Sequence, residues 1–470
     1  MKNNINVLAI AAFIFFGLSS CDNEYLEVEP RADIAFEDSG TTVTPEQMVT
    51  GAYGRFTGFS YAFSYLGITE IISDNADKGS APADTGADKH LLDGLTHTTS
   101  VPSVRAMWTE WYKSAGRATI AINYTNDYEE PYDESLKSRL IGEAKFLRAL
   151  HYFWLVRAFG DVPIQEIDLI TRAPKSEVYA YIISDLEDAI EALPLKSEYA
   201  ATDVGRATKG SAQGLLAKVY LYMEEYQNAY DAANVLINSG EYGLHPNYEE
   251  IWRESTENNQ ESIFEIQGRG EAINHGIQQY SSTQGARGQS GWGWGFNSPS
   301  QNLVDAFDEQ GDDVRKNATI IFAGETLWDG RVVSDAVANP RYNEKAYSSL
   351  NAGAADGDKN IRYLRYAEIL LIKAEAATYI GQDAAEPLNQ VRARAGLAPI
   401  SNPTLQQIWD ERRLELAMEH DRWFDLLRTG QAPSAMAADG KEFETGKHEL
   451  FPIPNDQLIQ TPEMVQNPGW

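Results

Sequence analysis

Apolar side chains recur every three or four residues over much of the chain, which is the spacing of amphipathic helices. On this basis we predict a helix that begins at Pro45 and further helices over about residues 101–125, 134–159 and 176–193. The segment 134–159 is apolar on nearly every side, so we expect other helices to enclose it. The pattern therefore predicts a mainly helical fold.

Two stretches, residues 207–238 and 361–395, have the pattern of antiparallel helix pairs. In the first, Ala229 and Ala233 fall where the second helix would meet the first. This offset resembles a tetratricopeptide repeat (TPR), whose period is about 34 residues. No such period holds along the whole chain, so we expect a few degenerate helix pairs and not a solenoid.

Near the C-terminus, Thr404 and Gln407 form a capping box that opens a helix predicted to run to about residue 427. This helix is rich in charges, which we interpret as a paired structural network. Prolines recur from residue 451 onward, so we expect no helix in the last segment.

Two stretches between the helical blocks have a different character. Residues 74–100 are rich in small and polar residues, and residues 267–300 contain many glycines together with aromatic residues. Short β-like runs at 262–266 and 319–322 predict a small amount of sheet near the second stretch.

The N-terminus has the features of a bacterial lipoprotein signal. Lys2 precedes an apolar run over residues 5–18, and the sequence Leu18-Ser19-Ser20-Cys21 follows. A cationic start, a short apolar run and small residues at the cut are typical of a secretory signal. The run is shorter than the roughly 20 residues of a membrane-spanning helix. We therefore predict cleavage before Cys21 and lipidation of its thiol, with an ordinary anchor or a buried thiol as the alternative.

The composition excludes some partners. The chain of 470 residues has 69 acidic and 39 basic side chains and a formal charge of −30. Such a surface repels nucleic acid and anionic headgroups. The single cysteine can form no internal disulfide, so stability must come from packing.

We predict no catalytic residue, no metal site and no cofactor. The seven histidines include no His-Glu-x-x-His motif and no close pair. Two suitably spaced carboxylates are enough for glycoside hydrolysis and cannot be recognised in a sequence, so a glycosidase remains an alternative.

The best candidates for ligand contact are aromatic residues in the glycine-rich segment 285–295. Indole and phenol rings stack on the C–H faces of sugars, and glycines would hold Trp292 and Trp294 at the surface. Residues one apart point to opposite sides of an extended chain, so we expect at most one of the two to meet a ligand. Tyr280 is a further candidate. The alternative is that these rings pack beneath the loop.

Five further segments are informative when they are taken together. They are GEAKFLRALHYFWLVRAFGDVP (142–163), RYLRYAEILLIKAEA (362–376), LNQVRARAG (388–396), ERRLELAMEHDRWFDLLRTG (411–430), and FPIPN (451–455) with QNPG (466–469). They follow the cysteine that we predict to be lipidated. In this order they resemble the SusD/RagB family of cell-surface glycan-binding lipoproteins.

The resemblance implies a SusD-like fold, built on TPR-like helix pairs with long irregular loops and minor β structure. It implies a non-catalytic protein on the outer face of the outer membrane that captures oligosaccharides. The implied partner is a SusC-like TonB-dependent transporter, which the protein covers as a lid. RagB-type members are associated with peptide import, so a peptide ligand is the alternative.

In the family, ligand contacts also come from the loop after an early Asp-Asn pair. Here Asp74 and Asn75 open that loop. Lys89, His90 and Asp93 are placed to reach sugar hydroxyls, and Asn75 and His90 are the tentative contacts. The loop lacks Trp and Tyr, which differs from a starch-type stacking arc and argues against starch. A solvated loop is the alternative interpretation.

The expected organisation has four parts. Residues 1–20 form the signal peptide and residues 21–44 the lipidated acidic tether. Residues 45–240 form the N-terminal helical region with TPR-like pairs. Residues 241–470 form the C-terminal SusD/RagB region, which includes the loop-rich ligand-binding part.

Overall fold

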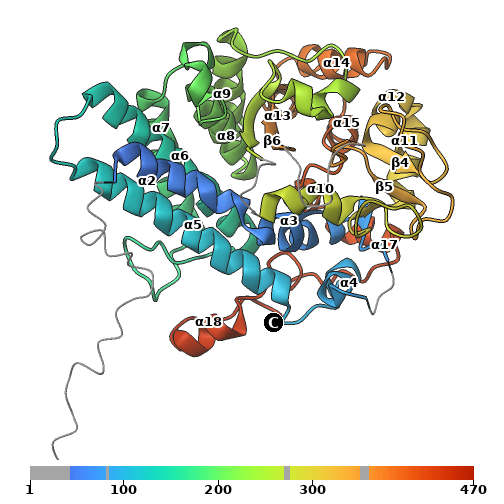
Figure 1. Ribbon diagram of the computed structural model, residues 1–470, viewed down its shortest axis with the longest axis horizontal. Coiled ribbons are helices and arrows are strands. Elements are labelled where there is room, and N and C mark those ends of the chain that lie inside the picture. The colour runs from blue at the N-terminus through green and yellow to red at the C-terminus, as the bar shows by residue number, and fades with distance from the viewer. Residues whose placement is uncertain (1–42, 81–83, 269–275, 350–358) are drawn as a thin grey trace, which may run out of the picture.

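The computed structural model describes residues 43–80, 84–268, 276–349 and 359–470. Helices predominate in these ranges, and the strands form three two-stranded sheets (Figure 1). The predicted fold class is therefore confirmed. Within the described ranges, no helix combines the length and hydropathy needed to cross a membrane. Cys21 and most of the predicted tether lie outside the described residues.

The first half of the described chain contains helices α2 to α9. The longest, α6 (Glu134–Phe159), begins where the Asp133 carboxylate accepts a 2.8 Å hydrogen bond from the backbone N–H of Leu136. It ends at Gly160, whose φ of +73° favours glycine. Its C-terminal two-thirds is almost entirely buried, as its all-round apolar pattern predicts. The helices of this half are α2 (Pro45–Tyr53), α3 (Phe59–Leu66), α4 (Ala87–Asp93), α5 (Pro102–Asn126), α6, α7 (Lys175–Ala192), α8 (Lys209–Tyr222) and α9 (Tyr226–Asn238).

Both predicted helix pairs are present. Helices α8 and α9 form the first, and α13 (Tyr366–Ile380) and α14 (Ala385–Arg394) form the second. Figure 1 shows α13 beside α8 and α9, and α13 is in contact with both. The second pair begins later than predicted, because residues 361–365 form strand β6 (Ile361–Arg365), which pairs antiparallel with β2 (Ser262–Ile266).

The predicted single helix over 404–427 is wrong. The capping box of Thr404 and Gln407 is present, but the helix ends at Glu415 and a separate helix begins at Arg422. Between them His420 has a φ of +76°, and its backbone N–H donates to the buried carboxyl group of Glu70. Contacts with a distant part of the chain therefore stabilise a break that local periodicity does not show.

The expectation of no helix after residue 451 is also wrong. Helix α18 (Asn455–Gln460) fits between two prolines, and Pro454 directly precedes it, where a missing N–H costs no helical hydrogen bond. The helices of the second half are α10 (Gln279–Gln284), α11 (Gln301–Gln310), α12 (Asp313–Thr319), α13, α14, α15 (Leu405–Glu415), α16 (Arg422–Arg428), α17 (Ala432–Ala438) and α18.

The two predicted β-like runs are strands β2 and β4 (Ile320–Phe322). Strand β4 pairs with β5 (Arg341–Asn343). A third short pair joins β1 (Ala76–Asp77) to β3 (Ser298–Pro299). This last pair connects the two irregular stretches recognised in the sequence, although they are more than 200 residues apart.

The remaining regular segments are single helical turns. They span Gly54–Thr57, Gly67–Ile71, Lys196–Glu198, Ala201–Asp203, Glu249–Trp252, Glu254–Thr256 and Gly276–Gln278.

The largest hydrophobic cluster extends from Ala52 to Met464 and draws on both the 45–240 and the 241–470 regions. Buried ion pairs run beside it, as the charge-rich segment 404–427 predicts. Glu415 is paired with Arg315 and Arg365 at 3.1 Å and 3.0 Å, and also with Arg394. Burial alone would raise the pKa of Glu415, but these arginines hold it well below its usual range.

Candidate functional site

The two irregular stretches meet at the surface. The backbone N–H of Asn297 donates to the carbonyl of Lys78 at 3.1 Å, and Asn339 bonds to both Gly295 and Ser80. A Cβ atom on Gly79 would lie 2.1 Å from the carbonyl oxygen of Gly295, and Gly79 has a φ of +73°. Only glycine allows the two loops to approach so closely.

An aromatic surface is exposed where these loops meet α3. Phe59 and Phe63 lie one turn apart on α3, with ring centroids 5.5 Å apart. The Trp294 ring lies 6.1 Å from Phe59 and 6.4 Å from Phe63, and Phe296 packs beneath Phe63 at 5.0 Å. Trp294 is 38% exposed and Phe59 is 42% exposed. We call Phe59, Phe63 and Trp294 the Trp294 platform.

Charged and polar groups border the platform. The Lys89 ammonium lies 3.6 Å from the centroid of the Phe63 ring, a close cation–π contact, and 3.3 Å from a carboxylate oxygen of Asp88. The Ser103 hydroxyl donates to the same carboxylate at 2.5 Å. Burial lowers the pKa of Lys89, and Asp88 opposes this shift. An aromatic surface with a polar border suits a ligand that has both C–H faces and hydroxyls.

Two open clefts flank the platform. One, of about 550 Å³, lies between Phe63 and Lys89 on one side and Arg105 and Thr109 of α5 on the other. The second, of about 320 Å³, is lined by His90, Asp93, Lys78, Ser80 and other polar residues. Both volumes fall in the range of roughly 300–1,000 Å³ that is typical of ligand sites.

The structure separates the two candidate tryptophans. Trp294 faces Phe59 and Phe63, whereas Trp292 is half-buried with its ring 5.5 Å from Tyr347 and the Arg331 guanidinium 4.6 Å above it. Their different surroundings agree with the expected alternation. The sequence did not rank the two tryptophans, and the structure makes Trp294 the stronger candidate for ligand contact.

Two other candidates are buried. The Tyr280 hydroxyl lies 2.9 Å from Nε2 of His420. The Asn75 side-chain oxygen accepts a 2.9 Å hydrogen bond from Nε of Arg413. These two residues support the site from below, and neither is presented to a ligand. His90 is exposed and lines the polar cleft.

Beside Asn75, the carboxylate of Asp74 accepts two 2.7 Å hydrogen bonds from Arg422, and Arg413 lies 3.3 Å away. Burial alone would raise the pKa of Asp74, but the two arginines hold it well below its usual range. The start of the 74–100 loop is thus attached to α15 and α16.

Sequence reasoning did not find Phe59 and Phe63. Their spacing of four on a helix is typical of core residues, and Tyr61 and Tyr65 of the same helix are buried. Within the described ranges no group of three or more His, Cys, Asp and Glu residues is placed to hold a metal ion.

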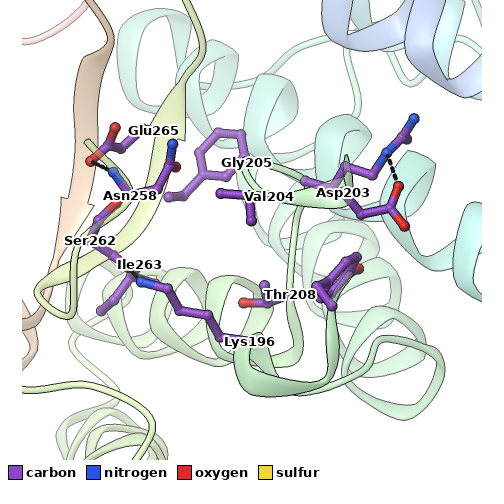
Figure 2. Close-up of a pocket in the computed structure, with 12 residues that line it drawn as sticks. Lys196, Asp203, Val204, Gly205, Thr208, Asn258, Ser262, Ile263 and Glu265 are labelled. Atoms are coloured by element: carbon purple, nitrogen blue, oxygen red, sulfur yellow. Dashed lines mark hydrogen bonds and ion pairs between the residues drawn. The ribbon is translucent and has the colours of Figure 1, made fainter. Parts of the chain in front are cut away.

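A more enclosed pocket lies elsewhere, between residues 196–208 and 258–265 (Figure 2). Lys196 crosses it and donates to the carbonyl of Ser262 at 2.8 Å, and Glu265 accepts from the backbone N–H of Asn258 at 3.0 Å. Its volume of about 120 Å³ is well below the roughly 300 Å³ at which ligand pockets begin, so it is too small for an oligosaccharide. We therefore place the candidate site at the Trp294 platform.

Comparisons with known proteins agree with this architecture. A family model described as "SusD family" matches residues 338–470, and one described as "Starch-binding associating with outer membrane" matches residues 24–221. A solved laminarin-binding SusD-like protein is 30% identical, with a TM-score of 0.78 and coverage of 91% of this chain and 99% of that one. The chain belongs to the SusD family.

Two further SusD-type proteins show similarity over nearly the full length. SusD-like protein P2 of Formosa agariphila is 29% identical over 92% of this chain and 93% of its own. Surface glycan-binding protein A from Bacteroides fluxus is 26% identical, with a TM-score of 0.79 and coverage of 92% and 100%. The family resemblance inferred from the sequence motifs is thereby confirmed.

Proposed function

We propose that this SusD-family chain is a non-catalytic glycan-binding protein, and that the Trp294 platform is its principal contact with the ligand. The observation that carries the proposal is an exposed aromatic surface beside open clefts, built by α3 and by a loop more than 200 residues further along the chain. The similar laminarin-binding and surface glycan-binding proteins support the same class of ligand.

In this proposal a sugar ring stacks on Trp294 and Phe59. Hydroxyls at the rim of the sugar then meet polar groups such as His90 in the neighbouring cleft. Apolar contact supplies most of the free energy, because ring faces lose water on stacking. Polar contacts select among sugars, because an unpaired buried hydroxyl is costly.

The proposal also covers the location of the protein in the cell and its partner. Cys21 carries the lipid anchor in the outer membrane, the chain faces the exterior, and it covers a SusC-like TonB-dependent transporter as a lid. Several acyl chains, at about 0.8 kcal/mol per buried CH₂, make detachment negligible. A Cys21→Ala variant should leave the membrane fraction, and the wild-type chain should co-purify with a β-barrel transporter.

Native gels that contain laminarin, soluble starch or xylan test the binding function. Retarded migration of the wild-type chain in at least one gel, with no new reducing ends in solution, is the expected result. New reducing ends would indicate a glycosidase. Binding of oligopeptides alone would indicate a peptide carrier of the RagB type.

A further inference from the structure

A second exposed indole lies outside the Trp294 platform. All ten tryptophans fall within the described ranges, and of these only Trp294 and Trp328 are exposed. Trp328 is the more exposed, at 48%. No contact of the Trp294 platform involves it, so its exposure needs a separate explanation.

The chain presents Trp328 on a tight turn between β4 and β5. The backbone N–H of Leu327 donates to the carbonyl of Arg331 at 2.8 Å, and Gly330, with a φ of +88°, donates to Leu327 at 2.9 Å. Leu327 is buried in a small cluster with Val333, whereas the next residue, Trp328, projects outward. The turn thus buries an aliphatic side chain and displays the indole.

The indole is supported from below and from one side. The Arg253 guanidinium lies 4.3 Å from the ring centroid, and Arg253 is itself fixed by a 2.9 Å ion pair with the buried carboxylate of Glu344. The Tyr347 ring lies 6.1 Å away at 71° to the indole. The Tyr347 hydroxyl donates to Asp329 at 2.7 Å.

A ring held in this way loses little conformational freedom when a ligand stacks on it, so its exposed surface is preorganised for binding. The next residue in the chain, Asp329, is held by Tyr347, and its carboxylate is a group that accepts hydrogen bonds from sugar hydroxyls.

The glycine-rich segment lies between the two exposed indoles. Trp292 packs toward Tyr347 at 5.5 Å, on the side of Trp328, whereas Trp294 packs toward Phe59. The two exposed rings therefore belong to different aromatic clusters that the same short segment connects.

We propose that Trp328 is a second glycan-binding platform, which stacks on a sugar ring of the same class of ligand that the Trp294 platform binds. This inference rests on the proposed glycan-binding function. A polysaccharide presents many equivalent rings, so two platforms on one chain increase its apparent affinity beyond that of either platform alone. A short oligosaccharide gains no such advantage.

The test measures polymer and oligomer binding in parallel. In native gels that contain laminarin, soluble starch or xylan, Trp328→Ala should weaken polymer binding at least about tenfold, because the second of two linked platforms is lost. Its affinity for a hexasaccharide of the same polymer should match that of the wild type. Trp294→Ala should weaken binding of both the polymer and the hexasaccharide.

Two further variants serve as controls. Tyr379→Ala removes another exposed aromatic ring, on α13, and should leave polymer binding unchanged. Trp328→Phe keeps an aromatic ring and should restore part of the affinity. Thermal unfolding of each variant checks that the fold is retained.

The outcomes separate the two proposals. If Trp294→Ala abolishes polymer binding and Trp328→Ala leaves it unchanged, the second platform alone is overturned. Trp328 then becomes a candidate contact for a protein partner. Absence of binding by the wild-type chain to every polysaccharide overturns the proposed function and the second platform together.

Discussion

An Asp74→Asn substitution tests whether buried ion pairs hold the start of the site loop in place. Asp74 is 2% exposed and accepts two 2.7 Å hydrogen bonds from Arg422. Asparagine keeps the size of the side chain but removes its charge, so Arg422 loses the carboxylate with which it pairs. Breaking a buried pair in this way costs about 3–5 kcal/mol.

This cost converts into a measurable change in the melting temperature. The entropy of unfolding is about 2.1 cal/mol/K per residue, or about 1 kcal/mol/K for 470 residues. We therefore expect Tm to fall by about 3–5 °C in differential scanning calorimetry at pH 7.

Asp456→Asn is the matched control. It breaks the 2.8 Å ion pair between Arg105 and Asp456, whose side chains are 59% and 57% exposed. Exposed pairs contribute about 0–1 kcal/mol, so Tm should change by no more than about 1 °C. Equal decreases in Tm for Asp74→Asn and Asp456→Asn would refute the expectation that a buried ion pair costs more to break than an exposed one.

The effect of Asp74 should also depend on pH with a definite sign. Its pKa in the folded chain lies well below the ordinary value of 3.8, because Arg422 and Arg413 outweigh the effect of burial. The stabilisation is therefore fully present above pH 3.8 and is lost as the pH falls below it. The difference in Tm between the wild type and Asp74→Asn should shrink in acid.

Two further predictions concern a buried acid and a close loop contact. Burial raises the pKa of Glu70 to about 8, so between pH 4.5 and 8 the folded chain keeps a proton that the unfolded chain has released. The folded chain therefore loses up to about 1.4 kcal/mol of stability per pH unit in this range. The Tm of Glu70→Gln should therefore rise relative to the wild type from pH 5 to pH 8, and parallel Tm profiles would contradict this. Gly79→Ala places a Cβ atom 2.1 Å from the Gly295 carbonyl and should weaken glycan binding in native gels. Gly240 has a similar φ of +72° with open space around it, so Gly240→Ala should leave glycan binding unchanged. Equal loss of binding in both variants would show that backbone strain alone is responsible.

Local patterns predicted most of the long helices within one residue. The segment 134–159 is α6 as predicted, because its apolar residues and the Asp133 cap act within the helix itself. The break between α15 and α16 could not be predicted in this way. It depends on Glu70, which accepts a hydrogen bond from His420 across 350 positions of sequence.

The candidate site was predictable only in part. The glycine-rich segment drew attention to Trp294, which is exposed, but Trp292 occurs in the same pattern and is half-buried under Arg331. Asn75 and Tyr280 are buried because their partners, Arg413 and His420, lie far along the chain. A sequence shows which residue types are present, and tertiary contacts decide which of them meet solvent.

The most direct test of the account is calorimetric titration into the wild-type chain and into Trp294→Ala, with a hexasaccharide of the polysaccharide that retards the wild-type chain in native gels. Trp294 is 38% exposed, which is about 95 Å² of a side chain of roughly 250 Å². At about 25 cal/mol per Å², covering this area contributes about 2.4 kcal/mol, or about 50-fold in Kd. We predict binding by the wild-type chain and a loss of this size in Trp294→Ala, whose thermal unfolding should show that it is still folded at the temperature of the titration. Equal affinities of the two proteins would contradict the account.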